Sequence, residues 1–77
     1  MSSWLYYSQE VDEMRFNLKE IRKKKGLSQE ALAKKSGVGR VTINRMETGK
    51  MTYTTSGTLT KLALALNTTI DSLIIKD

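Results

Sequence analysis

The sequence contains neither cysteine nor histidine. No disulfide can form without cysteine, so the stability of the fold must come from its core or from a partner subunit. Zinc fingers, thiol catalysis and the Ser–His or Cys–His pairs of nucleophilic enzymes need these two residue types, and their absence excludes them. No phosphate-cradling glycine loop and no cluster of carboxylates takes their place. The sequence therefore predicts a protein that is not an enzyme and that uses no metal and no cofactor.

Long apolar runs are also missing. No stretch approaches the roughly 18 consecutive apolar residues that a transmembrane helix needs, so none is expected. The start of the chain, MSSWLYYSQE, has no basic residue and no apolar segment of the length found in secretory signals. We therefore expect a cytoplasmic protein.

Negative charge is scarce beyond the N-terminus. The chain has 13 basic and 8 acidic residues, which gives a net charge of +5. Residues 1–13 contain three of the acidic residues and no basic one, so residues 14–77 carry a net charge of +8. This excess suits a polyanionic partner. The alternative, that the lysines only solvate a surface, stays open on charge alone.

A chain of 77 residues predicts one domain. Residues 1–13 are predicted to form an N-terminal extension or arm, and residues 14–77 the folded domain. The extension contains Trp4–Tyr7, a short apolar run of β-favouring residues. Either this run packs on the domain or on a second subunit, or it belongs to a disordered terminus.

The segment LSQEALAKKSGVGRVTINRMETG, from Leu27 to Gly49, predicts two short helices joined by a tight turn. Ser28 is a favourable N-cap for a helix over about residues 29–35. Gly37 lies just past that helix, where a positive φ is often required. The second helix should run from about Gly39 to Glu47 and end at Gly49. Two helices around a short glycine-bearing turn are typical of a helix-turn-helix.

Three further helices are expected, over about Glu10–Lys25, over about Thr55–Leu66, and as a short segment after the cap Thr69 that ends with Ile74 and Ile75. The segment Lys50–Gly57 between them is predicted to be a loop in which Tyr53 fills an apolar slot. The apolar periodicity predicts a core made of Met14, Leu18, Ile21, Leu27, Leu32, Val38, Ile43, Met46, Leu59, Leu62, Leu66, Ile70 and Leu73.

These motifs resemble a known family, the Cro/cI-type (Xre) helix-turn-helix regulators, which include the lambdoid phage repressors. The matching residues are Leu27-Ser28-Gln29, Leu32-Ala33, Ser36-Gly37-Val38, Thr42-Ile43, Glu47-Thr48-Gly49-Lys50, Thr58-Leu59, Lys61-Leu62-Ala63 and Ala65-Leu66. The resemblance covers roughly residues 14–75 and implies an all-α fold, a compact five-helix DNA-binding domain. The chain lacks the proline that the family usually has after Gly49, and its loop there is about one residue longer.

The second helix of the motif is predicted to read DNA. Opposite its apolar positions Ile43 and Met46 lie four residues that can contact base edges, namely Arg40, Val41, Asn44 and Arg45. Arginine can pair with guanine, asparagine with adenine, and valine can contact the thymine methyl group. The alternative is an ordinary amphipathic helix with a polar outer face.

Further contacts are expected at the ends of the two helices. The resemblance implies that Gln29 contacts a phosphate, and unpaired amides at a helix start support this. Ser28, Thr48 and Lys50 are further candidates for phosphate contacts, although Ser28 and Thr48 could serve only as helix caps. The resemblance also implies an internal salt bridge between Arg22 and Glu47; the alternative is two unrelated exposed charges.

The sequence thus predicts a sequence-specific DNA-binding transcriptional regulator, a repressor that binds a palindromic operator as a homodimer. The dimer contact is expected at Leu73, Ile74 and Ile75, or at the arm Trp4–Tyr7. An antitoxin that binds both DNA and a toxin protein, and a protein-interaction module that has lost DNA binding, remain as alternatives.

Overall fold

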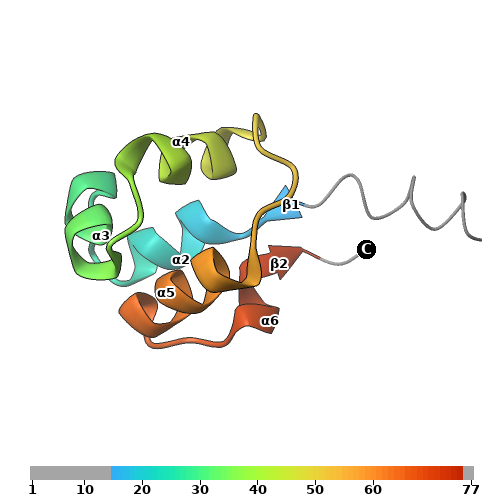
Figure 1. Ribbon diagram of the computed structural model, residues 1–77. Coiled ribbons are helices and arrows are strands. Elements are labelled where there is room, and N and C mark those ends of the chain that lie inside the picture. The colour runs from blue at the N-terminus through green and yellow to red at the C-terminus, as the bar shows by residue number, and fades with distance from the viewer. Residues whose placement is uncertain (1–14, 76–77) are drawn as a thin grey trace, which may run out of the picture.

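The computed structural model describes residues 15–75, so the arm and Met14 of the expected core lie outside the described part. Within this range five helices and two short strands follow one another (Figure 1). They are β1 (Arg15–Phe16), α2 (Leu18–Lys24), α3 (Gln29–Ser36), α4 (Arg40–Thr48), α5 (Ser56–Leu66), α6 (Ile70–Leu73) and β2 (Ile74–Ile75). This architecture confirms the predicted all-α fold and adds a small sheet to it.

Helix α3 packs between two other helices, α4 and α5. It contacts both α4 and α5, while α2 contacts α4 and α6 contacts α5. The two-stranded sheet lies at the end of the domain opposite α3, where both ends of the described chain also lie (Figure 1). The α3–turn–α4 unit is therefore held by helices on its inner side, and the outer side of α4 is left uncovered.

Side-chain caps begin three of the helices. The hydroxyl oxygens of Ser28, Thr55 and Thr69 each accept a hydrogen bond from a backbone N–H in the first turn of the helix that follows. Such a bond satisfies one of the amides that a helix start leaves unpaired. At the other ends, Gly37 and Gly49 close α3 and α4 with φ values of 78° and 81°. The predicted turn glycines thus occupy the left-handed backbone conformation that favours glycine.

The core is formed by apolar residues from every helix. The fully or nearly fully buried ones are Phe16, Leu18, Leu32, Val38, Ile43, Met46, Leu59, Leu62, Ala63, Ala65, Leu66 and Leu73. Ile21, Leu27 and Ile70, also expected in the core, are half-buried and pack against it. No helix between residues 15 and 75 is both long enough and apolar enough to cross a membrane.

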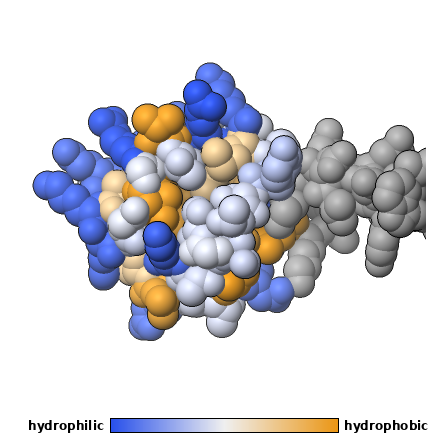
Figure 2. All heavy atoms as spheres, in the orientation of Figure 1, coloured by the Kyte–Doolittle hydropathy of each residue, from blue (hydrophilic) through white to orange (hydrophobic). Residues whose placement is uncertain are grey.

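The outer surface carries few large apolar side chains. Those exposed in the described part are Val41, Tyr53, Leu64 and Ile75. In Figure 2 the viewed face is mostly hydrophilic, and its apolar side chains form separate patches. Apolar residues scattered in this way are ordinary on a protein surface.

The prediction that the first helix begins near Glu10 is wrong for the residues the structure describes. Arg15 and Phe16 are extended and pair antiparallel with Ile75 and Ile74, and α2 begins only at Leu18. The backbone N–H of Asn17 continues this pairing with a 2.8 Å bond to the Leu73 carbonyl. If Arg15 and Phe16 were helical, these backbone hydrogen bonds could not form. The extended conformation is therefore set by the distant C-terminal segment and not by the local helical pattern.

Two expectations for the second half of the domain are also corrected. The last helix is a single turn, and Ile74 and Ile75, expected at the end of this helix, form β2 instead. Both are β-branched residues, which favour extended backbone. Tyr53 does not fill an apolar slot, because it is 66% exposed. From the same loop it is Met51 that packs against the core.

The burial of Leu73 gives the first testable prediction. Replacing this residue, whose side chain is 0% exposed, with alanine should lower the free energy of unfolding by about 2–5 kcal/mol because it leaves a cavity. The matched control is Leu64→Ala, at a leucine that is 77% exposed, with an expected change within about 0.5 kcal/mol. Urea denaturation followed by circular dichroism measures both. Equal effects of the two substitutions would contradict this description of the core.

Candidate nucleic-acid interface

Helix α4 has one buried face and one exposed face. Ile43 and Met46, which are 0% and 2% exposed, anchor it in the core. The four predicted base-reading residues, Arg40, Val41, Asn44 and Arg45, are all exposed. This division follows from the helical repeat, which places residues three or four apart on one side. The structure therefore brings the four residues together on the outer surface of the domain.

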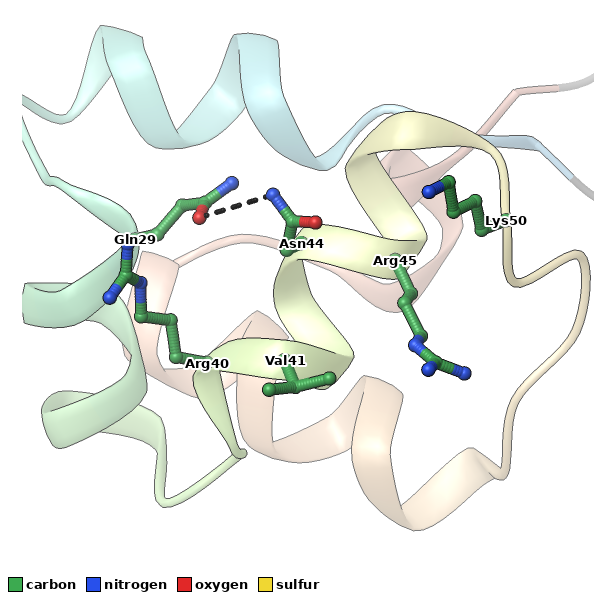
Figure 3. A pocket seen from close by; sticks show the side chains of 6 residues that line it. All are labelled: Gln29, Arg40, Val41, Asn44, Arg45 and Lys50. Carbon is green, nitrogen blue, oxygen red and sulfur yellow. Dashed lines mark hydrogen bonds between the residues drawn. The ribbon is translucent and has the colours of Figure 1, made fainter.

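These residues line a shallow hollow of about 390 Å³ (Figure 3). Gln29 of α3 and Lys50, just after α4, complete its lining. The hollow thus combines three cationic side chains with two amides and with Val41, which is 67% exposed. Cations suit phosphates, and amides together with an apolar group suit the edges of bases.

A buried ion pair joins α2 to the end of α4. The Nε atom of Arg22 donates to Oε2 of Glu47 at 2.6 Å, and its Nη2 donates to Oε1 at 3.0 Å. The third guanidinium nitrogen, Nη1, donates to the carbonyl of Leu27 at 2.6 Å. The two side chains are only 8% and 2% exposed. Arg22 and Glu47 thus form a two-pronged salt bridge, as the family resemblance implies, and not two unrelated surface charges.

Both partners of this pair are held in their charged forms. The hydrogen bond to Glu47 raises the pKa of Arg22 despite its burial. Burial acts to raise the pKa of Glu47, but hydrogen bonds from Arg22 and Gln29 outweigh it and the pKa is lowered. Glu47 therefore remains an ionised carboxylate, which can only accept hydrogen bonds.

Gln29 has a contact that the sequence did not indicate. Its side-chain Nε2 donates to Oε1 of Glu47 at 3.0 Å, and its Oε1 accepts from Nδ2 of Asn44 at 3.5 Å. The residue is half-buried and lies between the ion pair and the exposed face of α4. No local pattern could have revealed these bonds, because Gln29 is 15 and 18 residues away from its two partners.

The three other candidates for phosphate contacts differ in the hydrogens that they still have available to donate. The Ser28 hydroxyl oxygen accepts the cap bond from Ala31 N–H, so its hydrogen stays available. The Thr48 hydroxyl donates its single hydrogen to the Asn44 carbonyl at 2.9 Å. Lys50 is exposed and lines the hollow, and its ammonium group has three hydrogens to donate. By this comparison, Lys50 and Ser28 are better suited to bind a phosphate than Thr48.

The three residues expected at a dimer contact do not share one environment. Leu73 is 0% exposed, so its predicted role in such a contact is wrong: its side chain belongs to the core. Ile74 is half-buried, and Ile75 is 43% exposed. Ile75 also borders a second hollow of about 280 Å³, whose apolar lining comes from Phe16, Met46 and Met51. Trp4–Tyr7, the other expected contact, lies outside the described residues.

Comparisons with known proteins agree with this geometry. A family model described as helix-turn-helix matches residues 18–73, which is most of the chain. The chain is also 46% identical over 65 residues to an uncharacterized HTH-type transcriptional regulator of Archaeoglobus fulgidus, covering 83% of this chain and 90% of that protein.

The buried pair provides a second prediction. Glu47→Ala should lower the free energy of unfolding by roughly 3–5 kcal/mol, because it leaves the Arg22 guanidinium buried without its counter-charge. Glu30→Ala serves as the control, since Glu30 is exposed in the first turn of α3, where its favourable interaction with the helix dipole limits the expected loss to about 1 kcal/mol. Equilibrium urea unfolding gives both values. A Glu47→Ala protein that unfolds at the wild-type midpoint would rule out an energetically coupled buried pair.

Proposed function

Because this chain belongs to the Cro/cI-type (Xre) helix-turn-helix family of transcriptional regulators, we propose that it is a repressor that binds a palindromic operator as a homodimer. Its function is to occupy a specific stretch of double-stranded DNA and so to block access to it. The observation that carries this proposal is the exposed face of α4, where groups that suit bases lie next to groups that suit phosphates.

Base reading is assigned to α4, which enters the major groove with its N-terminal half leading. Arg40, in the first turn, can donate two hydrogen bonds to guanine O6 and N7. Val41 can contact a thymine methyl group, and Asn44 can pair with adenine. Arg45 lies one turn beyond Val41 on the same face and extends the set. The exposure of all four side chains supports this assignment.

Phosphate binding is assigned to the rim of this surface. Lys50 supplies an exposed positive charge after α4, and Ser28 supplies a hydroxyl hydrogen at the start of α3. The start of α3 also offers unpaired backbone N–H groups and the positive end of the helix dipole. Contacts of this kind set the position of a protein on the duplex without reading its sequence.

A homodimer is favoured because a single recognition helix buries little surface, and specific affinity usually needs two half-sites. We place the contact at β2, where Ile75 is exposed beside the apolar hollow lined by Phe16, Met46 and Met51. Within the described residues β2 pairs only with β1, so its outer edge can accept a strand from a second copy.

The third prediction separates base reading from phosphate binding. Arg40→Ala should weaken binding to the selected operator by about 1–3 kcal/mol and relax the preference at one base pair. Lys50→Ala should weaken operator and scrambled DNA alike and should lower the salt dependence by about one counterion. The operator is first selected from a random DNA pool, and affinities are then measured at several salt concentrations.

Lys61→Ala is the control for this experiment, because Lys61 is an exposed lysine of α5 that does not line the hollow. Its substitution should change both affinities little. If Arg40→Ala weakens operator and scrambled DNA equally, Arg40 contacts a phosphate and the placement of α4 in the groove is wrong. A wild-type protein that binds no DNA at all would favour a protein-interaction module instead.

The fourth prediction concerns assembly. The selected DNA should contain two half-sites about 34–36 Å apart or a multiple of this spacing. Analytical ultracentrifugation should give two protein chains per operator, and Ile75→Glu should reduce this to one because it places a charge in the apolar contact. Leu64→Glu, at an exposed leucine of α5 that does not line the hollow beside Ile75, should leave two chains per operator. A wild-type complex with one chain on a full operator would contradict the homodimer.

A further inference from the structure

A chain of hydrogen bonds runs from the interior of the domain to the DNA-facing surface. It begins at the Arg22–Glu47 pair, passes through the bond from Gln29 to Glu47, and ends at the bond from Asn44 to Gln29. Figure 3 shows this last bond. The side chains of the ion pair are 8% and 2% exposed, whereas Asn44 at the other end is an exposed residue. Gln29 thus links the buried charges to a predicted base-reading side chain.

The chemistry of each group decides which way the next amide points. The ionised carboxylate of Glu47 only accepts hydrogen bonds, so Gln29 must turn its NH₂ group toward it. The carbonyl oxygen of Gln29 then faces Asn44. Because this oxygen also only accepts, Asn44 must turn its own NH₂ group toward Gln29. The buried charge pair thereby selects one of two orientations for each amide in turn.

We propose that Gln29 is a positioning residue, which holds the Asn44 amide in the orientation that reads adenine. One Nδ2 hydrogen of Asn44 binds Gln29, and the other hydrogen and Oδ1 remain for the DNA. Adenine presents an acceptor at N7 and a donor at N6 in the major groove, so it can use both. A guanine edge presents two acceptors, and one of them would oppose Oδ1. This inference rests on the proposed function, in which α4 enters the major groove.

The same geometry changes the role that the family resemblance implies for Gln29. One Nε2 hydrogen of Gln29 is used by Glu47, and its carbonyl oxygen, which accepts from Asn44, repels a phosphate. The side chain therefore has a single Nε2 hydrogen left for a phosphate. We assign the main phosphate contact at the start of α3 to backbone N–H groups and to the Ser28 hydroxyl. The two roles can be distinguished by experiment, because a phosphate contact acts on every DNA sequence and a positioning contact acts at one base pair.

The test is a double-mutant cycle of Gln29→Met and Asn44→Ala. Methionine keeps the length of glutamine and removes both hydrogen bonds. Gln29→Met should weaken binding to the selected operator by about three- to tenfold. The loss of discrimination should occur only at the base pair that Asn44→Ala identifies. In the Asn44→Ala background, Gln29→Met should have no further effect. Equal weakening of operator and scrambled DNA in both backgrounds would overturn the proposal and assign a phosphate contact to the side chain.

A second measurement does not depend on DNA. In the free protein, the side-chain NH₂ resonances of Asn44 should shift on Gln29→Met and should keep their positions in the control Lys61→Ala, at an exposed lysine of α5 outside the hollow. Unchanged Asn44 resonances in Gln29→Met would overturn the positioning role, and circular dichroism establishes that each variant is folded. Failure of the proposed function looks different: the wild-type protein would then select no sequence from the random pool, while the NMR result would still show whether Gln29 positions Asn44.

Discussion

The guanidinium of Arg22 and the carboxylate of Glu47 are both removed from water, and each is satisfied by groups on distant parts of the chain. Arg22 also bonds to the carbonyl of Leu27, and Glu47 also bonds to Gln29. All of these hydrogen bonds can form only when α2, the turn before α3, α3 itself and the end of α4 are packed together as in the native fold. A buried charge without its partners is very unfavourable, so alternative placements of α4 are strongly disfavoured. No buried side-chain nitrogen or oxygen in the described part of the chain lacks a hydrogen-bond partner.

This pair positions α4, but the apolar core supplies most of the free energy of folding. The free energy needed to remove two charges from water is about as large as the free energy gained from their attraction. The apolar side chains of Leu18, Ile43 and Leu73 are buried without such a desolvation penalty. The two effects are complementary. The core holds the inner face of α4, and the pair with Gln29 fixes the end and the outer face of the same helix. We propose that these contacts preorganise the candidate DNA-reading surface, which lowers the entropy lost on binding.

Features that depend on neighbouring residues could be predicted from the sequence. Glycines at positions 37 and 49, the cap Ser28, and the apolar pair Ile43 and Met46 indicated the helix-turn-helix, and the structure has these elements with boundaries within about one residue. The exposed set on α4 followed from the helical repeat alone. The pairing of Arg22 with Glu47 came from the family resemblance and not from any local pattern, since 25 residues separate the two.

Features that depend on contacts between distant segments were decided only by the tertiary structure. Phe16 lies in an extended segment because Ile74 is present to pair with it, and local helix propensity cannot register a partner nearly sixty residues away. Leu73 and Ile75 have equally apolar side chains, yet one is buried and the other exposed, because the sheet continues where the last helix stops. The bonds of Gln29 to Glu47 and Asn44 form for the same reason. The sequence determined which helices form and which face of α4 is polar, and tertiary packing determined which of its side chains are held in place.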